Sequence, residues 1–254
     1  VSISTNLSKF LGLVILLVLF FRYLKIDLSW RYLKPFPWDS AKKILSIAVP
    51  SGAETLSYQL SQTFIMKIVN VFGLIVINTK IYVYIMAMFC YSYALAISAA
   101  MQIVMGYLIG EKNFGQVSTT VWKAVGIATL ITGLITTTLY FNSDIVFRIF
   151  TDNEEILKLG QQIFFIEIFL EIGRAVNIVM VRALQAAGDI KTPVTVGIGG
   201  MWFIAVFGAY TLGIVLNFGL VGVWIAMALD EIIRALIFIY RWQSGRWQQK
   251  ILIN

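Results

Sequence analysis

The sequence predicts an all-α polytopic membrane protein: a six-helix transmembrane bundle preceded by one further helix. The first observation is composition, because 59% of the 254 residues are hydrophobic and only 13% are charged, about half the charged content of a soluble domain. The second is a series of long apolar runs, most of them at or above the roughly 20 residues that cross a bilayer. The third is length: these runs far exceed the strands of roughly 10 residues that build membrane barrels.

Seven apolar runs give the expected helices in chain order. The first is short, covers residues 10–21 and lies near the start of the chain. The chain begins at Val1 and shows neither a basic leading segment nor a small-residue cleavage site, so we expect no signal peptide and interpret the sequence as a fragment. The six runs of the bundle are 47–73, 81–109, 117–141, 157–184, 193–216 and 218–240.

The segment between the first two runs predicts the orientation of the chain. Residues 22–43 carry six basic side chains against Asp27 and Asp39, and cytoplasmic loops are enriched in Lys and Arg. Pro35 and Pro37 favour a linker over a single helix there. Alternation from this cytoplasmic linker predicts outside loops at 74–80, 142–156 and 217–219, and inside segments at 110–116, 188–193 and 240–250.

This arrangement predicts a multi-pass protein of the cell membrane with the linker and the C-terminus in the cytoplasm. The net charge of +7 is concentrated in short loops, which is typical of membrane topology rather than of a nucleic-acid partner. The sequence has no histidine and no cluster of metal ligands, so proton chemistry would use carboxylates. The single cysteine, Cys90, lies in an apolar run and is interpreted as a small buried side chain.

A compact charged turn, GDIKTP at 188–193, connects two of the apolar runs. Gly188 is expected to end one helix in a conformation with positive φ, and Pro193 to open the next. Asp189 is expected at the level of the lipid headgroups. The pattern is that of a structural helix–helix turn, and it predicts no function by itself.

Glu54 is the first charged residue expected inside the membrane. Ionisable groups within spanning helices are costly and indicate functional sites. Glu54 follows Pro50, which is expected to loosen the start of a helix, and Tyr58 and Ser61 share its helical face. A functional Glu54 would bind and release H⁺ or Na⁺ beside these two residues. The alternative is an interfacial carboxylate satisfied by nearby serines and the backbone.

The run 157–184 carries a second charged cluster: Glu167, Glu171, Arg174 and Asn177. Spacings of three and four residues put these side chains on one helical face. Two acids and one arginine would leave a negative site in a cavity, although a purely structural ion pair is the alternative. We predict that Arg174 pairs with Glu171 or, across the bundle, with Glu54.

A third cluster lies in the last run, where Asp230 and Arg234 are four residues apart and are expected to pair along the helix. Because the pair is expected nearer the cytoplasmic end, a structural role is favoured. Aromatic and Met side chains are dense between residues 82 and 105. They are interpreted mainly as packing, and alternatively as the lining of an adaptable cavity for apolar cations.

Three stretches together resemble the multidrug and toxic compound extrusion (MATE) transporters. They are VPSGAE at 49–54, LEIGRAVNIVMVRALQAAGDIKTPV at 170–194 and GLVGVWIAMALDEIIRALIFIYRWQSGRW at 219–247. The order and spacing of the last two, and their basic end with its tryptophans, are similar to the C-terminal half of that family. The likeness extends from about residue 40 to the end.

The resemblance implies one lobe of a two-lobe transporter that exports organic cations in exchange for H⁺ or Na⁺. Residues 1–24 would be the last helix of the N-terminal lobe, 25–43 the cytoplasmic linker and 44–254 the C-terminal six-helix lobe. The missing N-terminal lobe is then the expected protein partner, small organic cations the cargo and the lipid bilayer the surroundings. No cofactor is implied beyond the coupling ion, and no enzymatic activity.

Residue by residue, Glu54 matches the membrane-embedded Glu that the family has in the first helix of this lobe. Where better-known members have an Asp in the helix before the GDxxTP turn, this sequence has Glu171 and Arg174. Two other functions remain open. A flippase for lipid-linked glycans would need a basic cavity, whereas the acid excess favours cationic cargo. A membrane scaffold without transport would not need unpaired buried acids.

Overall fold

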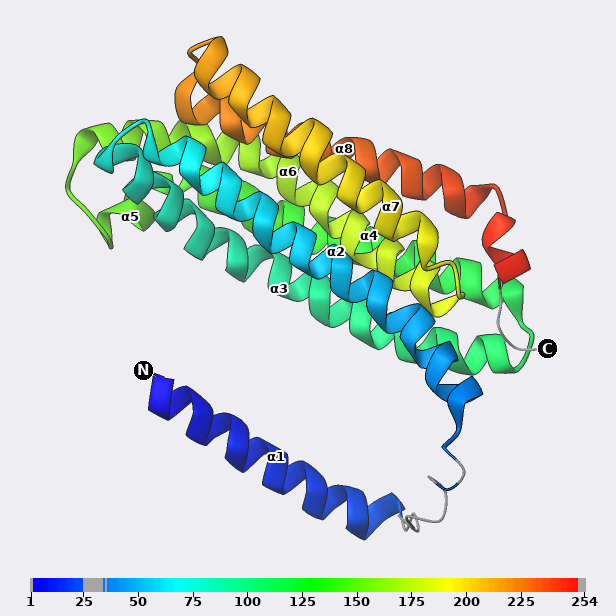
Figure 1. The fold of residues 1–254 in the computed structure, drawn as a ribbon. Coiled ribbons are helices and arrows are strands. Elements are labelled where there is room, and N and C mark those ends of the chain that lie inside the picture. The colour runs from blue at the N-terminus through cyan, green and yellow to red at the C-terminus, as the bar shows by residue number, and fades with distance from the viewer. Residues whose placement is uncertain (1, 25–33, 35, 251–254) are drawn as a thin grey trace. The chain divides into compact units, whose positions relative to one another are not determined.

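The computed structural model describes residues 2–24, 34 and 36–250 (Figure 1). The described residues form helices and turns and contain no β-strand, which confirms the all-α prediction. The chain divides into two compact units, residues 1–46 and 47–254. The first unit contains α1 (Ser2–Leu24). Much of the linker predicted at 25–43 falls on 25–33 and 35, which lie outside the described residues.

The second unit contains the bundle, apart from the first turns of α2, which precede residue 47. From Trp38 onwards, the described helices are α2 (Trp38–Asn70), α3 (Leu74–Gly110), α4 (Phe114–Phe141), α5 (Ser143–Arg148), α6 (Glu154–Ala186), α7 (Lys191–Gly199), the π-helices η2 (Gly200–Val206) and η3 (Ala209–Val215), α8 (Gly219–Gln243) and the 3₁₀-helix η4 (Arg246–Lys250).

The start of α2 differs from the sequence prediction. The helix begins at Trp38, directly after Pro37, so residues 38–43 of the predicted linker are helical. Pro50 therefore lies inside α2, and the expectation that it opens a loosened helix start beside Glu54 is wrong. The physical reason is that Pro37 does not prevent a helix from beginning at the next residue, since proline is tolerated just before and in the first turn of a helix.

Two predicted loops also differ. Residues 74–80 form the first two turns of α3 rather than an outside loop. The polar Thr79 is accommodated in the helix because its hydroxyl donates a hydrogen bond to the carbonyl of Ile75. The turn is confined to residues 71–73. The loop predicted at 142–156 contains the short helix α5, whose Phe147 is buried and contacts the ring of Phe164.

Four described helices are long and apolar enough to cross a membrane by length and composition: Asn6–Tyr23 of α1, α3, α4, and the helix from Lys191 to Val215 that joins α7, η2 and η3. The helices α2, α6 and α8 have 33, 33 and 25 residues, so they also have the length of a span. They are more polar because they carry charged residues midway along their length.

The helix α6 lies at the centre of the bundle and packs against α3, α4, α5 and α8. Two apolar cores follow one another along it. One core includes residues of α6 up to Leu170 and of α8 up to Ala228. The other core begins at Ala175 on α6 and at Ala235 on α8. The short gap between the two cores is charged on both helices, and it defines a polar layer halfway along the bundle.

Close backbone contact holds α8 against the π-helical segment. At Gly222 of α8, an ideal Cβ would lie only 2.6 Å from the backbone C and O atoms of Leu212 in η3. Only a residue without a side chain fits this distance. The absence of a Cβ therefore lets the two helices approach at this point and fixes α8 relative to η3.

The turn after α6 confirms the prediction for Gly188, which has φ 87° and lies just beyond the end of the helix at Ala186. Pro193 is buried in the first turn of α7. Asp189 is only 3% exposed, because its carboxylate accepts from Arg241 Nε of α8 at 2.7 Å and from the Thr192 hydroxyl at 2.9 Å. The turn is thus tied to the end of α8.

We predict that Arg241→Ala lowers the free energy of unfolding by about 3 kcal/mol, since breaking a buried ion pair leaves the partner charge without compensation. Thermal unfolding of the purified protein in detergent would measure the loss. Arg246→Ala, at an exposed position of η4, is the control and should change stability by less than about 0.5 kcal/mol. Equal stability of the two variants would show that the Asp189–Arg241 pair contributes nothing.

Candidate functional site

Arg174 lies at the centre of the polar layer. Its Nη1 binds the Glu171 carboxylate and lies 3.9 Å from Glu167 Oε1, and its guanidinium also stands over the ring of Tyr91 at 5.4 Å. The predicted pairing of Arg174 with Glu171 is confirmed. Its Nε lies 3.7 Å from Oε1 of Glu231 on α8, a partner that the sequence analysis missed. One guanidinium thus contacts three carboxylates on two helices.

Glu167 and Glu171 form the inner part of this layer. They are 2% and 0% exposed, and both carboxylates approach the same nitrogen, Nη1 of Arg174. Glu167 Oε2 accepts from the indole Nε1 of Trp224 at 2.5 Å. Because both carboxyl groups are removed from water, their interactions act in a medium of low dielectric constant and are correspondingly strong.

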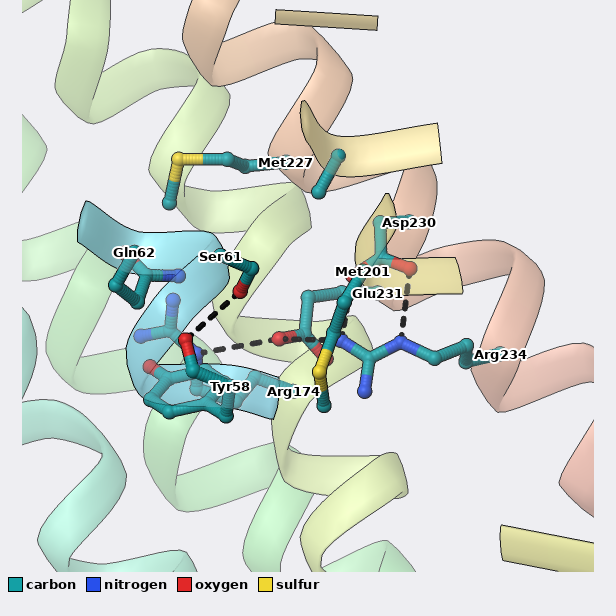
Figure 2. Close-up of a pocket in the computed structure, with 10 residues that line it drawn as sticks. Tyr58, Ser61, Gln62, Arg174, Met201, Met227, Asp230, Glu231 and Arg234 are labelled. Carbon is teal, nitrogen blue, oxygen red and sulfur yellow. Dashed lines mark hydrogen bonds and ion pairs between the residues drawn. The ribbon is translucent and has the colours of Figure 1, made fainter. Parts of the chain in front are cut away.

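Glu231 forms the outer part together with Asp230 and Arg234 of α8 (Figure 2). Arg234 binds Asp230 through Nε at 2.9 Å and Nη2 at 2.6 Å, as predicted, and its Nη2 also lies 3.1 Å from Glu231. Asn177 of α6 donates to Glu231 Oε2 at 2.6 Å and to the Glu231 carbonyl at 2.8 Å. Asn177 and Glu231 therefore join α6 to α8.

The position of Asp230 and Arg234 corrects the sequence analysis, which placed them nearer the cytoplasmic end. Both lie near the middle of α8, which runs from Gly219 to Gln243, and both line the same small pocket as Arg174. The helix continues to Gln243, beyond the end of the apolar run at 240. The pair therefore belongs to the same layer as the acids of α6.

A cavity of about 530 Å³ opens on the outer part of the layer. This size is typical of sites for small organic molecules. Two smaller pockets, of about 10 and 30 Å³, share Tyr58 and Arg174 with it. The large cavity is lined by Ser51, Glu54, Thr55, Tyr58, Tyr91, Leu95, Arg174, Asn177, Ile178, Val181, Arg182, Gln185, Met201, Glu231 and Arg234.

Glu54 lies on the α2 wall of this cavity, half-buried, and does not share in the predicted alternative pairing with Arg174. Its Oε1 comes so close to α7 that a Cβ on Gly197 would lie 3.1 Å away, so a glycine makes room for the carboxylate. Tyr58 lies one turn further along α2, on the same wall. Ser61 is 1% exposed and its hydroxyl donates to the Tyr58 carbonyl, so Ser61 lines only the smallest pocket.

The charges on the cavity wall differ from those of the layer as a whole. The wall carries the acids Glu54 and Glu231 and three arginines, Arg174, Arg182 and Arg234. With the buried acids behind the wall included, five acids face three arginines, so the predicted acid excess exists but lies partly out of reach of cargo. Arg174 and Arg234 are already bound to carboxylates. Arg182 contacts Gln102 at 3.3 Å.

The aromatic and methionine residues between 82 and 105 are packed only in part, since Tyr84, Phe89 and Tyr93 are 51%, 58% and 42% exposed. Met101 and Met105 are buried in an apolar core, and Cys90 is buried as predicted. Tyr91 is the aromatic residue of this segment that faces the large cavity, and Tyr84 lines the pocket beside Glu167. Packing is therefore shown for Met101 and Met105, and a cavity lining for Tyr91 and Tyr84.

The site residues that sequence reasoning missed are Glu231 and Trp224. Glu231 comes directly after Asp230 and precedes Arg234 by three residues, so an acid next to an expected ion pair was a usable signal. Trp224 gave no such signal, since a tryptophan in an apolar run is typical of packing. Across the part of the chain that the structure describes, no group of three or more His, Cys, Asp or Glu side chains is placed to hold a metal ion.

Comparison with known proteins gives a consistent result. The family profile MatE matches residues 50–211. The uncharacterized transporter YisQ of Bacillus subtilis is 33% identical over 98% of this chain and 55% of its own length. A probable multidrug resistance protein NorM of Thermotoga maritima is 22% identical over 100% of this chain and 54% of its own length. The chain spans about half the length of the curated relatives it matches.

Solved structures show the same fold. A MATE transporter of Vibrio cholerae superposes with a TM-score of 0.85 at 18% identity, over 96% of this chain and 55% of that one. A MOP superfamily transporter of Pyrococcus furiosus superposes with a TM-score of 0.78 at 20% identity, over 91% of this chain and 53% of that one. Its description reports a binding pocket of reversed polarity that suggests a different function for that protein.

Proposed function

The chain belongs to the MATE family, whose members are transporters and not enzymes, and from this premise we propose that it forms part of a secondary antiporter. This antiporter exports organic cations and drugs in exchange for H⁺ or Na⁺ by alternating access. The observation that supports the proposal is the 530 Å³ cavity beside a mid-membrane layer with an excess of acids, since polar groups at such depth typically mark transport pathways.

The organisation of the transporter is part of the proposal. Residues 44–254 form its C-terminal lobe, 1–24 the last helix of its N-terminal lobe and 25–43 the linker between them. The missing N-terminal lobe closes the open side of the cavity and is the partner. The match to about half of each relative supports this arrangement.

The proposal also fixes the orientation. The linker and the C-terminal segment lie in the cytoplasm, since their basic residues oppose translocation. A cysteine placed at Ser40 or at Gln248 should then be protected from an impermeant thiol reagent in intact cells. Labelling at either position would contradict this topology.

Glu54 is the residue proposed to couple cation exchange to transport. It is half-buried on the cavity wall beside Gly197, where it can meet both cargo and a coupling ion, and Tyr58 offers an aromatic face on the same wall. Cation–π contact with tyrosine stabilises organic cations by about 0.5–2 kcal/mol. Glu167, Glu171, Arg174 and Asn177 complete the proposed site behind and beside the cavity.

We predict that Glu54→Gln lowers gradient-driven efflux by at least about tenfold in cells that produce the transporter containing this chain, because the amide cannot change charge. Folding should survive, since a neutral amide of the same size is less costly to bury. Efflux of a fluorescent organic cation, normalised to folded protein, is the measurement. The control is Glu155→Gln, at the exposed start of α6. Efflux by Glu54→Gln at the control's level would remove Glu54 from the mechanism.

The alternative of a flippase for lipid-linked anionic glycans is favoured by one observation, the three arginines on the cavity wall. Two of them are already neutralised by Glu171 and Asp230, which leaves little positive charge for a pyrophosphate. A scaffold without transport offers no reason for a cavity of this size. An antiporter therefore accounts for more of the site than either alternative.

A further inference from the structure

The polar layer consists of two triads, each with one acid more than it has bases. The inner triad is Glu167, Glu171 and Arg174. The outer triad is Asp230, Glu231 and Arg234, and its Glu231 and Arg234 line the large cavity. If every group were ionised, each triad would carry one surplus negative charge in the middle of the membrane, where an uncompensated charge is costly.

The two acids of the inner triad do not line the large cavity, so their surplus charge must be neutralised by something other than cargo. Two of its four carboxylate oxygens are engaged, Glu167 Oε2 by Trp224 and Glu171 Oε1 by Arg174. With both groups ionised, Glu171 Oε2 is a buried oxygen that accepts from no described residue. A buried acceptor without a donor is costly, because it has lost its hydrogen bonds to water.

One proton removes both problems. Placed on either carboxyl group, it gives the pair a hydrogen-bond donor of its own, and the triad becomes neutral beside Arg174. Two buried carboxyl groups that approach the same guanidinium nitrogen share a proton for the same reason that paired aspartates do. With two oxygens already bound by N–H donors, the pair offers a place for a proton rather than an oxygen shell for a metal ion.

We propose that the buried Glu167–Glu171 pair is a proton-binding site, and that Arg174 links its protonation to the charge of Glu231 in the cargo cavity. This inference rests on the proposed antiport and names its coupling ion as H⁺. When the pair loses its proton, its two charges hold Arg174. Arg234 alone is then left to balance Asp230 and Glu231, so the outer triad keeps a surplus negative charge that attracts a cationic cargo. When the pair is protonated, it holds Arg174 less strongly, and the guanidinium neutralises Glu231, which releases the cargo.

The geometry supports this link. Arg174 is the residue that contacts both triads, with Glu171 and Glu167 on one side and Glu231 at 3.7 Å on the other. A pocket of about 30 Å³ adjoins Glu167 and Arg174, enough volume for a water molecule that carries a proton. This pocket shares Tyr58, Tyr91 and Arg174 with the large cavity. The path for a proton between the large cavity and the glutamate pair is therefore short.

Other titratable and charged groups face the pair from several helices and must be considered with it. The interacting groups on the neighbouring elements are Tyr58 of α2, Lys80, Tyr84, Cys90 and Tyr91 of α3, and Glu231 of α8. Of these, Glu231 is the acid that competes for Arg174. Glu54 lies on the far wall of the cavity and is the second acid that a test must separate from the pair.

The test is infrared spectroscopy of the purified protein in detergent, which resolves the C=O stretch of a protonated carboxyl group. At neutral pH we expect such a band in the unaltered protein. Glu167→Gln and Glu171→Gln should each abolish it, because the remaining glutamate then pairs with Arg174 as a carboxylate. Glu54→Gln, Glu231→Gln and the exposed control Glu155→Gln should retain it.

Trp224→Phe gives an independent measurement if a glutamine variant is unstable. It removes the donor to Glu167 Oε2 and should shift the band without abolishing it. Absence of the band in the unaltered protein, its persistence in both pair variants, or an unshifted band in Trp224→Phe would overturn the proposal. Efflux driven by a Na⁺ gradient without a carboxyl band would leave the antiport standing and reject this site. The band without any gradient-driven efflux would reject the antiport alone.

Discussion

Replacing Arg174 by alanine is expected to lower the free energy of unfolding in detergent by about 3–5 kcal/mol, the cost of removing one member of a buried ion pair. The loss should be at the upper end of that range, because Arg174 contacts Glu167, Glu171 and Glu231 and its removal leaves all three without this cation. Thermal unfolding of the purified protein gives the change directly.

Two further variants make this result specific. Arg182→Ala lies on the same helix at an exposed position and loses a contact to Gln102, so it should change stability by less than about 0.5 kcal/mol. Arg174→Met combined with Glu171→Gln should recover much of the loss, because a buried ion pair replaced by uncharged groups of similar volume is often as stable. If Arg174→Ala unfolds at the same temperature as Arg182→Ala, the charged layer is not held together as described.

A second large effect is expected at Gly222, where α8 meets η3. A valine side chain there must displace the Leu212 backbone, to which even a Cβ would come within 2.6 Å. Overpacking typically costs about 1–3 kcal/mol, and contact with backbone atoms puts Gly222→Val at or above the upper end. The yield of folded protein and its thermal unfolding both report the change.

The matched control for this variant is Gly126→Val in the middle of α4. No heavy atom lies within 4 Å of the position of a Cβ there. The difference in helix propensity between valine and glycine is small compared with the cost of overpacking. Gly126→Val should therefore retain nearly full stability. A Gly222→Val protein as stable as this control would show that α8 and η3 are further apart than the structure has them.

Much of this fold could be predicted from the sequence, because apolar runs of spanning length identify helices without tertiary information. The run 117–141 corresponds closely to α4, Phe114–Phe141. The boundaries that failed were those where polar residues belong to a helix. Thr79 and Lys80 were assigned to a loop, yet the helix begins at Leu74 and the Thr79 hydroxyl bonds within it. Composition alone cannot separate polar residues near the start of a helix from a loop.

The site was predictable only within single helices. Spacings of three and four residues identified the Glu171–Arg174 and Asp230–Arg234 pairs, both of which the structure contains. Contacts between helices depend on how the helices pack, which the sequence pattern does not determine. For that reason the bonds from Asn177 and Trp224, which join α6 to α8, were not foreseen, and neither was the burial of Asp189 by Arg241.

The π-helical turns of η2 and η3 have a consequence for how this sequence tolerates insertions and deletions. A π-helix closes its hydrogen bonds over five residues rather than four and behaves as an α-helix with an added residue. Deleting one residue between 200 and 206 would let the segment return to α-helix, and the parts on either side would keep their faces, because the wide turn absorbs the added residue. Gly197 would then stay beside Glu54, and Gly213 would stay against Val223. The same deletion in α4, which is an ordinary α-helix, would turn one part of the helix by about 100° relative to the other.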